Sequence, residues 1–198
     1  ELLKICKEYP QDLWFHDKLS RIYALEENWK LAHDSINNLK SIPSELKNNL
    51  ADLKILSGAS PLDAFKLSSN SIQVVKETLR FYIDRDNLKK AVSILERTWM
   101  NLLCLEIIEV FMKYKCNNEK EKLKRYKLVS KILKKYLDEE SNETKLGLAF
   151  ASYEASIWGE SQNFLNKIKS EEWDERALDL YKKVSTKTTK EEEYIFKS

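Results

Sequence analysis

Glycine and proline are scarce in this sequence, and no other feature constrains the fold as strongly. The chain has 198 residues, of which three are glycine and three are proline, whereas the two together usually make up about 12% of a soluble domain. Because turns between β-strands are built largely from these residues, the sequence predicts an all-α fold. Hydrophobic residues make up 42% of the chain, which is enough to bury a core and excludes wholesale disorder.

The charge balance argues against a dedicated nucleic-acid-binding protein. The chain has 34 basic and 32 acidic residues, a net charge of +2, whereas nucleic-acid binders carry a clear basic excess. Only six of the basic residues are arginine, the residue whose planar fork reads base edges. We therefore predict no nucleic-acid partner.

Apolar residues recur at helical spacing along the whole chain, with short breaks between segments. This pattern predicts about a dozen helices of about ten to twenty residues, joined by loops of about two to five residues. Loops this short place consecutive helices antiparallel. We predict one domain, residues 1–198, with a less regular middle section at 102–141. The last predicted helices span 142–157, 159–169, 171–184 and 188–197.

One spacing recurs along the chain: a large residue is followed nine positions later by a small one. A large residue late in one helix can pack across a tight turn onto a small residue early in the next, where the two backbones approach closely. This is the spacing of a tetratricopeptide unit, and the chain resembles that family. The resemblance implies antiparallel helix pairs stacked as a degenerate α-solenoid. The pairs are Tyr23 and Ala32, Ile55 and Ala64, Tyr82 and Ala91, and, with serine in both places, Ser152 and Ser161.

A more specific resemblance surrounds Trp158 and Gly159. Residues 154–165 read EASIWGESQNFL, which is similar to the E-A-x-x-W-G-x-A-x-x-x-L turn of bacterial HemY-type tetratricopeptide proteins. Residues 148–151 and 95–99 resemble two further segments of that family. The resemblance implies that Trp158, Gly159 and Ser161 pack the helices of one repeat together.

Membership of this family would imply the soluble domain of a bacterial inner-membrane protein associated with haem biosynthesis. Its expected role is a non-catalytic protein–protein interaction scaffold or regulator. No run approaches the roughly 18–20 apolar residues that span a bilayer. Because the chain begins with Glu1 rather than methionine, we expect it to be a fragment whose membrane helices lie elsewhere. The domain is expected in the cytoplasm, with the side of the membrane left open.

We predict no enzyme activity and no bound cofactor. The chain has two histidines and lacks the H-E-x-x-H, G-x-S-x-G and P-loop motifs. Its three cysteines form no C-x-x-C pair, which indicates reduced thiols. One alternative function is a porphyrin-binding or haem-binding chaperone, because four side chains could ligate iron. These are Cys6, His16, His33 and Cys116, and ordinary packing and surface roles remain open for all of them.

Residues 113–137 form a second alternative site. Positions 113–135 hold ten basic and two acidic residues, and apolar residues line the opposite stripe. Such a helix could contact an anionic membrane surface or an acidic partner, or could simply present a solvated face. The candidate contact residues are Lys122, Lys124, Arg125, Lys131, Lys134 and Lys135.

The resemblance to tetratricopeptide proteins also implies a concave, partner-binding groove. In that family the first helix of each pair lines the groove, through residues off the packing stripe. Basic groups beside an aromatic residue could hold a partner carboxylate, although these could equally be solvated positions. Trp14 is the tryptophan that lies off the packing face, whereas we expect the other four in the core. The predicted groove residues are Trp14, Asp17, Arg21, Gln73, Lys76, Arg80, Glu143, Leu146 and Phe150.

Overall fold

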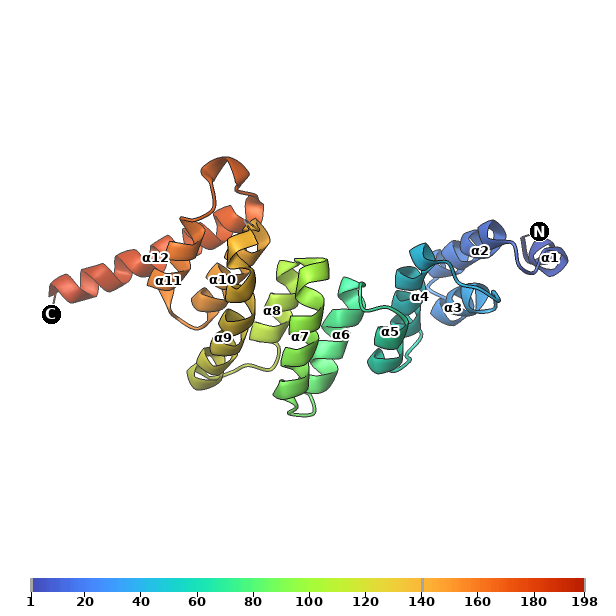
Figure 1. Ribbon diagram of the computed structural model, residues 1–198, viewed down its shortest axis with the longest axis horizontal. Helices are drawn as coiled ribbons and strands as arrows, with labels where there is room; N and C mark the ends of the chain where they lie inside the picture. The colour runs from blue at the N-terminus through green and yellow to red at the C-terminus, as the bar shows by residue number, and fades with distance from the viewer. Residues whose placement is uncertain (1, 140, 198) are drawn as a thin grey trace. The chain divides into compact units, whose positions relative to one another are not determined.

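The computed structural model describes residues 2–139 and 141–197, and within them the chain is all-α, as predicted. Side-chain surroundings are described for these residues except 45, 138, 139, 170 and 190–197. This part of the chain contains twelve α-helices, two short 3₁₀ helices and no strand (Figure 1). The α-helices are α1 Leu2–Glu8, α2 Leu13–Leu25, α3 Trp29–Asn37, α4 Ser44–Leu56, α5 Pro61–Leu67, α6 Ile72–Ile83, α7 Leu88–Leu102, α8 Leu105–Lys113, α9 Glu119–Leu133, α10 Asn142–Glu154, α11 Trp158–Leu165 and α12 Glu175–Lys197. The 3₁₀ helices are η1 Lys134–Glu139 and η2 Ser170–Glu172.

The chain divides into two compact units, residues 1–81 and 82–198. In the first unit, α3 packs on both α2 and α4, and α4 packs on α5. Ile36, Leu39, Leu46 and Leu50 form the core between α3 and α4. A second cluster joins Ala51 of α4, Ala64 of α5 and Val74 of α6. The assignment of all residues to one domain stays a prediction.

In the second unit, α10 lies at the centre. It packs on α8, α9, α11 and α12, and Figure 1 shows α8, α9 and α10 side by side. Eight of its residues are buried, among them Leu148, Ala149 and Ala151, which are fully inaccessible. Gly147 allows a close approach here, because a Cβ would lie 3.0 Å from Leu133 of α9 and 3.4 Å from Trp99 of α7. The order of contacts is that of stacked antiparallel pairs, α8 with α9 and α10 with α11, followed by α12.

Four helix ends share one hydrogen-bonded turn, and these turns coincide with the repeated sequence spacing. In each turn a residue with positive φ follows the helix, and the next N–H donates to a carbonyl five residues earlier, which is the Schellman arrangement. The donors and acceptors are Asn28 to Tyr23 (2.8 Å), Ala59 to Lys54 (3.1 Å), Asn87 to Tyr82 (2.9 Å) and Ile157 to Ser152 (2.9 Å). The residues with positive φ are Glu27 (57°), Gly58 (87°), Asp86 (52°) and Ser156 (60°).

The small residue of each pair lies four positions after the helix N-cap and is fully buried. Ala32, Ala64, Ala91 and Ser161 all have 0% exposure, and each donates its N–H to the N-cap carbonyl. Two serines join the helices of a pair at matching places. Ser20 Oγ of α2 donates to the Ala32 carbonyl at 2.8 Å, and Ser161 Oγ of α11 donates to the Ala149 carbonyl of α10 at 2.7 Å.

Ile55 packs against the cluster that contains Ala64, and the turn before α5 has one residue more than the other three, because the donor Ala59 precedes the N-cap Ser60. Two sequence expectations need correction. Gly159 is exposed, and nothing lies within 4 Å of a Cβ placed on it, so packing does not require a glycine there. The helices predicted at 171–184 and 188–197 form one helix, α12, since no glycine or proline interrupts residues 175–197.

Candidate functional site

In the first unit, three of the predicted groove residues lie together on α2. Trp14 is 59% exposed and lines a shallow hollow with Asp17 and with Leu46 of α4. Arg21 Nε donates to Asp17 at 2.8 Å. A partner carboxylate would therefore have to compete with Asp17 for Arg21.

Two of the three predicted groove residues on α6 contact Glu77 of the same helix. Gln73 Nε2 donates to Glu77 at 3.2 Å, and Arg80 pairs with Glu77 at 2.5 Å. The third, Lys76, is half-buried. The guanidinium of Arg80 thus lies beside a carboxylate of its own helix, and the role of this set in holding a partner stays a prediction.

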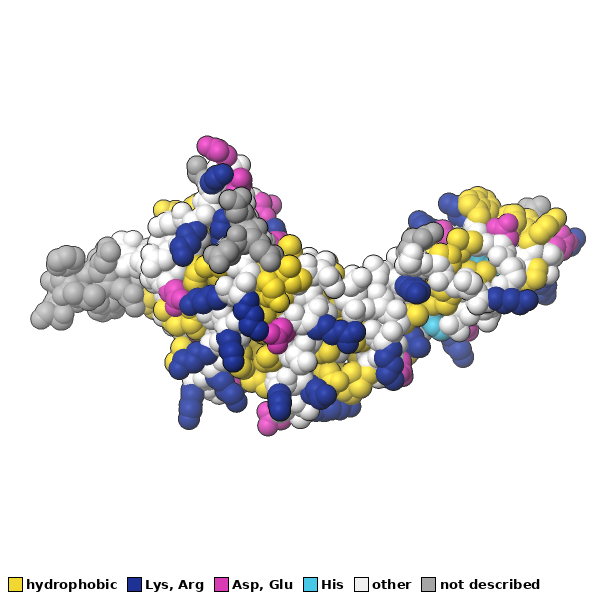
Figure 2. Space-filling model, viewed as in Figure 1, with side chains coloured by type: hydrophobic (Ala, Val, Ile, Leu, Met, Phe, Trp, Pro, Cys, Tyr) yellow, Lys and Arg dark blue, Asp and Glu magenta, His cyan; other side chains and the backbone are white. Residues whose placement is uncertain are grey.

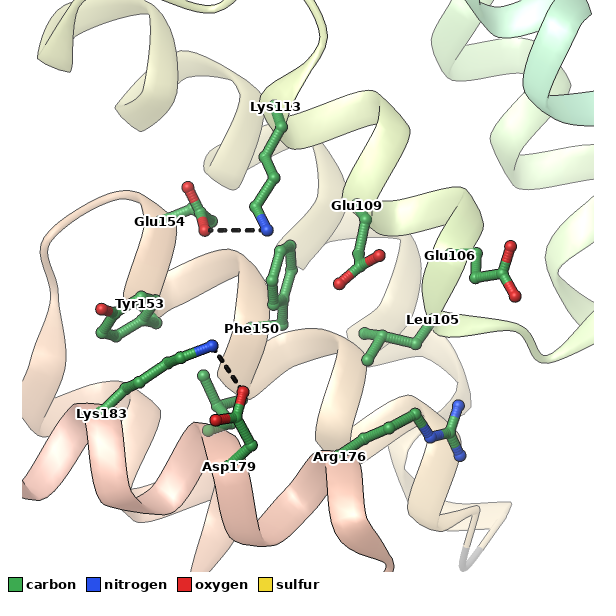
Figure 3. Close-up of a pocket in the computed structure, with 11 residues that line it drawn as sticks. Leu105, Glu106, Glu109, Lys113, Phe150, Tyr153, Glu154, Arg176, Asp179 and Lys183 are labelled. Atoms are coloured by element: carbon green, nitrogen blue, oxygen red, sulfur yellow. Dashed lines mark hydrogen bonds and ion pairs between the residues drawn. The ribbon is translucent and has the colours of Figure 1, made fainter.

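In the second unit, a cleft of about 290 Å³ opens between α8, α10 and α12. Phe150 of α10 lies at its centre, with Leu105 of α8 beside it (Figure 3). Leu180 of α12 also lines the cleft. Phe150 is 6% exposed, so its ring forms an apolar floor rather than a projecting anchor. The volume is at the lower end of the range of about 300–1,000 Å³ usual for ligand sites. It suits a few side chains of a binding segment.

Neither of the other predicted groove residues on α10 lines the cleft, and both line a separate, smaller hollow. Glu143 accepts a hydrogen bond of 2.7 Å from Arg176, which lines the cleft from α12. Leu146 is buried and lies in the smaller hollow with Ile168 and Ala177. Of the predicted groove residues on α10, only Phe150 lines the cleft, and its role in binding a partner stays a prediction. The cleft residues that α8 and α12 contribute are not among the groove residues predicted from the sequence.

Every cation that lines the cleft has an acidic partner. Lys113 lies 3.6 Å from Glu154 and 4.7 Å from the centre of the Phe150 ring. Lys183 pairs with Asp179 at 2.5 Å, and this hydrogen bond raises the pKa of Lys183. Arg176 contacts Asp174 as well as Glu143, and the hydrogen bond with Glu143 raises the pKa of its guanidinium.

Glu109 of α8 is a carboxylate of the cleft without such a partner. Its side chain is half-buried and points into the cleft beside Phe150 (Figure 3). Among the residues that the structure describes, no cation lies within ion-pair distance of it. Its negative charge nevertheless contributes to the raised pKa of Lys183. The cleft therefore combines an apolar floor with a carboxylate that a cationic group could approach.

The cleft residues that sequence reasoning missed do carry a sequence signal. Leu105, Glu109 and Lys113 follow one another at intervals of four, and Arg176, Leu180 and Lys183 at intervals of four and three, so each set lies on one helix face. The first set lies in the section predicted to be less regular, 102–141, whereas the second lies wholly within the helix predicted at 171–184.

One of the six basic residues predicted to contact a membrane or an acidic partner, Arg125, does not lie on the surface. Arg125 is 1% exposed and donates to the Phe111 and Tyr114 carbonyls at 2.7 and 2.8 Å. Its predicted contact with a membrane or acidic partner is wrong, because the side chain is enclosed between α8 and α9. Lys134 pairs with Glu160 of α11 at 3.2 Å, and Lys135 pairs with Glu96 of α7.

The four candidate haem ligands are largely enclosed, and haem binding by them stays a prediction. Cys6, His16 and Cys116 are buried, and His33 is half-buried. His16 Nδ1 lies 2.6 Å from the Ser35 carbonyl, and burial raises the pKa of both cysteine thiols. Within the described part of the chain, no group of three or more His, Cys, Asp or Glu side chains could hold a metal ion.

Two further observations bear on identity. None of the described helices is long and apolar enough to cross a membrane. In comparisons with known proteins, no family model matches the chain, and no curated protein matches it.

Proposed function

We propose that this chain is a non-catalytic protein–protein interaction module, and that the cleft between α8, α10 and α12 binds a segment of a partner protein. The observation that carries this proposal is the pairing of charges. The three cations of the cleft are neutralised from within the chain, whereas Glu109 is left to interact with a partner.

The cleft favours a segment in which an apolar side chain lies next to a lysine or arginine. The apolar side chain would cover Phe150, Leu105 and Leu180, and burial of such a group is the main favourable term in binding. The neighbouring cation would approach Glu109, where a charge-assisted hydrogen bond adds both affinity and orientation. The cations of the cleft, already paired, would contribute less to affinity than Glu109.

A peptide library panned on the whole chain tests this proposal. We expect the enriched peptides to carry a basic residue beside an apolar one. For a synthetic peptide of this kind, Glu109→Gln should weaken binding about tenfold, because a hydrogen bond to a charged group contributes about 1.5–3 kcal/mol. The matched control is Glu175→Gln, an exposed residue of α12 outside the cleft, which should leave the affinity unchanged.

Two outcomes would contradict the proposal. Enriched peptides without basic residues would mean that Glu109 does not select the partner. Equal affinities for the wild type and the Glu109→Gln variant would mean that the peptide binds elsewhere. Circular dichroism of each variant checks that the helices are retained.

The finer assignment, the soluble domain of a HemY-type inner-membrane protein associated with haem biosynthesis, is also a proposal. Its support is the E-A-x-x-W-G sequence of the α10–α11 turn and the buried small residue, Ser161, that follows it. The coding sequence upstream of Glu1 tests this assignment. Two membrane-spanning segments there would support it, and a different leading domain would contradict it.

A further inference from the structure

The exposed side of α9 carries a row of lysines with two leucine side chains among them. Lys120, Lys124, Lys127 and Lys131 are exposed, and their spacing of four, three and four residues places them along one stripe about 16 Å long. Leu123, which is 38% exposed, and the half-buried Leu128 lie among them. Figure 2 shows basic side chains gathered over α9 with hydrophobic surface between them.

The acidic residues of α9 do not neutralise this row. Glu121 pairs with the buried Arg125 at 2.5 Å, and Glu119 pairs with Lys122 at 3.0 Å. Within the described part of the chain, Lys120, Lys124, Lys127 and Lys131 form no ion pair. The burial of Arg125, which corrects the sequence prediction, therefore also engages Glu121, a carboxylate that lines the same hollow as the lysine row.

We infer that this face of α9, formed by Lys120, Lys124, Lys127, Lys131, Leu123 and Leu128, binds the surface of anionic lipid bilayers. All six residues lie along one exposed side of a single helix and line the same open hollow, so a flat surface can meet them together. Leucines among the lysines can enter the headgroup region while the ammonium groups contact lipid phosphates. Each lysine near an anionic surface adds to the affinity.

The inference is independent of the proposed partner cleft, because none of these six residues lines the cleft. The net charge of the whole chain is only +2, so general electrostatic attraction would be weak. Binding to anionic vesicles would therefore have to come from a local concentration of positive charge. The salt dependence should be strong, since exposed charges are screened within about 10 Å at 0.1 M salt.

Co-sedimentation of the whole chain with vesicles tests this inference. Vesicles of phosphatidylcholine with about 30% phosphatidylserine should bind the chain, and pure phosphatidylcholine vesicles should not. The triple variant Lys124→Glu, Lys127→Glu, Lys131→Glu should bind at least about tenfold more weakly. A Leu123→Gln variant should weaken binding less, because it removes apolar contact and leaves the charge.

The matched control reverses three exposed lysines of the first unit, Lys30, Lys40 and Lys47, and so changes the net charge equally. Equal losses in the two triple variants would overturn the inference, since only net charge would then matter. No binding to the anionic vesicles would overturn it as well. Binding to polyglutamate or RNA in place of the vesicles would assign the face to a soluble polyanion and would equally contradict it.

Discussion

Arg125 is a buried cation whose hydrogen bonds join two helices. Its guanidinium reaches the Phe111 and Tyr114 carbonyls at the end of α8 and the Glu121 carboxylate on α9. The carbonyls at a helix end have no partner within the helix, so Arg125 satisfies groups that would otherwise be buried without a hydrogen bond. This places the charge in the turn between α8 and α9 rather than at the surface.

Replacing Arg125 by an uncharged residue should lower the stability of the fold. We expect Arg125→Met to lower the free energy of unfolding by about 3 kcal/mol, because it leaves two carbonyls and a carboxylate without their donor. Urea denaturation measures the change. The exposed neighbour Lys124 is the control, and Lys124→Met should change stability by less than about 0.5 kcal/mol. A loss below about 1 kcal/mol for Arg125→Met would mean that these hydrogen bonds contribute little.

The raised pKa of the Asp52 carboxyl predicts that the stability of the fold depends on pH. It accepts a hydrogen bond from Ser71 Oγ, but burial raises the pKa of its carboxyl above the ordinary value of 3.8, with the Ser71 hydrogen bond opposing the shift. A raised pKa means that the folded state binds the proton more tightly than the unfolded state. Stability should therefore fall as the pH rises from about 3.8 through the folded-state pKa.

Asp52→Asn removes this ionisation and retains an acceptor for Ser71. The variant should be more stable than the wild type at pH 7, and the difference should shrink as the pH is lowered below the ordinary value of 3.8. Urea denaturation over this range of pH measures it. The control is Asp63→Asn, an exposed carboxylate on α5. A difference that is constant with pH would contradict the account.

Among the helices and turns, the repeated Schellman turn is the unit that organises the fold. Three of its four residues with positive φ are not glycine, so the turns at Glu27, Asp86 and Ser156 accept a conformation that costs an L-residue roughly 1–2 kcal/mol. The contact of the following helix through a small buried residue compensates for this cost. The hairpin is therefore fixed by packing more than by turn sequence.

Two glycines allow the effect of backbone conformation on stability to be measured apart from the effect of packing. Nothing lies within 4 Å of a Cβ at Gly58 or at Gly159, but only Gly58 has a positive φ, of 87°. Gly58→Ala should therefore destabilise the chain by roughly 1–2 kcal/mol. Gly159→Ala should stabilise it by up to about 1 kcal/mol, since alanine favours the first turn of α11. Thermal and urea unfolding of the two variants should shift in opposite directions, and shifts of the same sign would refute this explanation.

The sequence predicts the contacts within the helix pairs well. The nine-residue spacing identified the small residues 32, 64, 91 and 161, all of which are fully buried. The sequence shows them because only a small side chain fits where two helix backbones approach closely. The ends of helices were less predictable. The α12 helix continues through residues 185–189. Thr186, Thr188 and Thr189 there donate hydrogen bonds to carbonyls three or four residues earlier, and sequence alone does not distinguish this from capping.

For the molecule as a whole, the type of function stays a prediction from the sequence. The lack of catalytic motifs and the helical repeat pattern both favour an interaction module. Phe150 is among the predicted groove residues because groove positions follow the repeat spacing. Glu109 could not be predicted, because its role depends on which of the surrounding cations already has an acidic partner. Two of those pairs, Lys113 with Glu154 and Arg176 with Glu143, join helices distant in sequence.

The central claim is that a partner segment binds between α8, α10 and α12, and amide chemical-shift mapping tests it most directly. The whole ¹⁵N-labelled chain would be titrated with a panned peptide that carries an apolar residue beside a lysine. The account predicts that the largest shifts lie around Glu109, Phe150 and Leu180. Shifts confined to the hollow at Trp14 or to the lysine face of α9, with none at these residues, would contradict it.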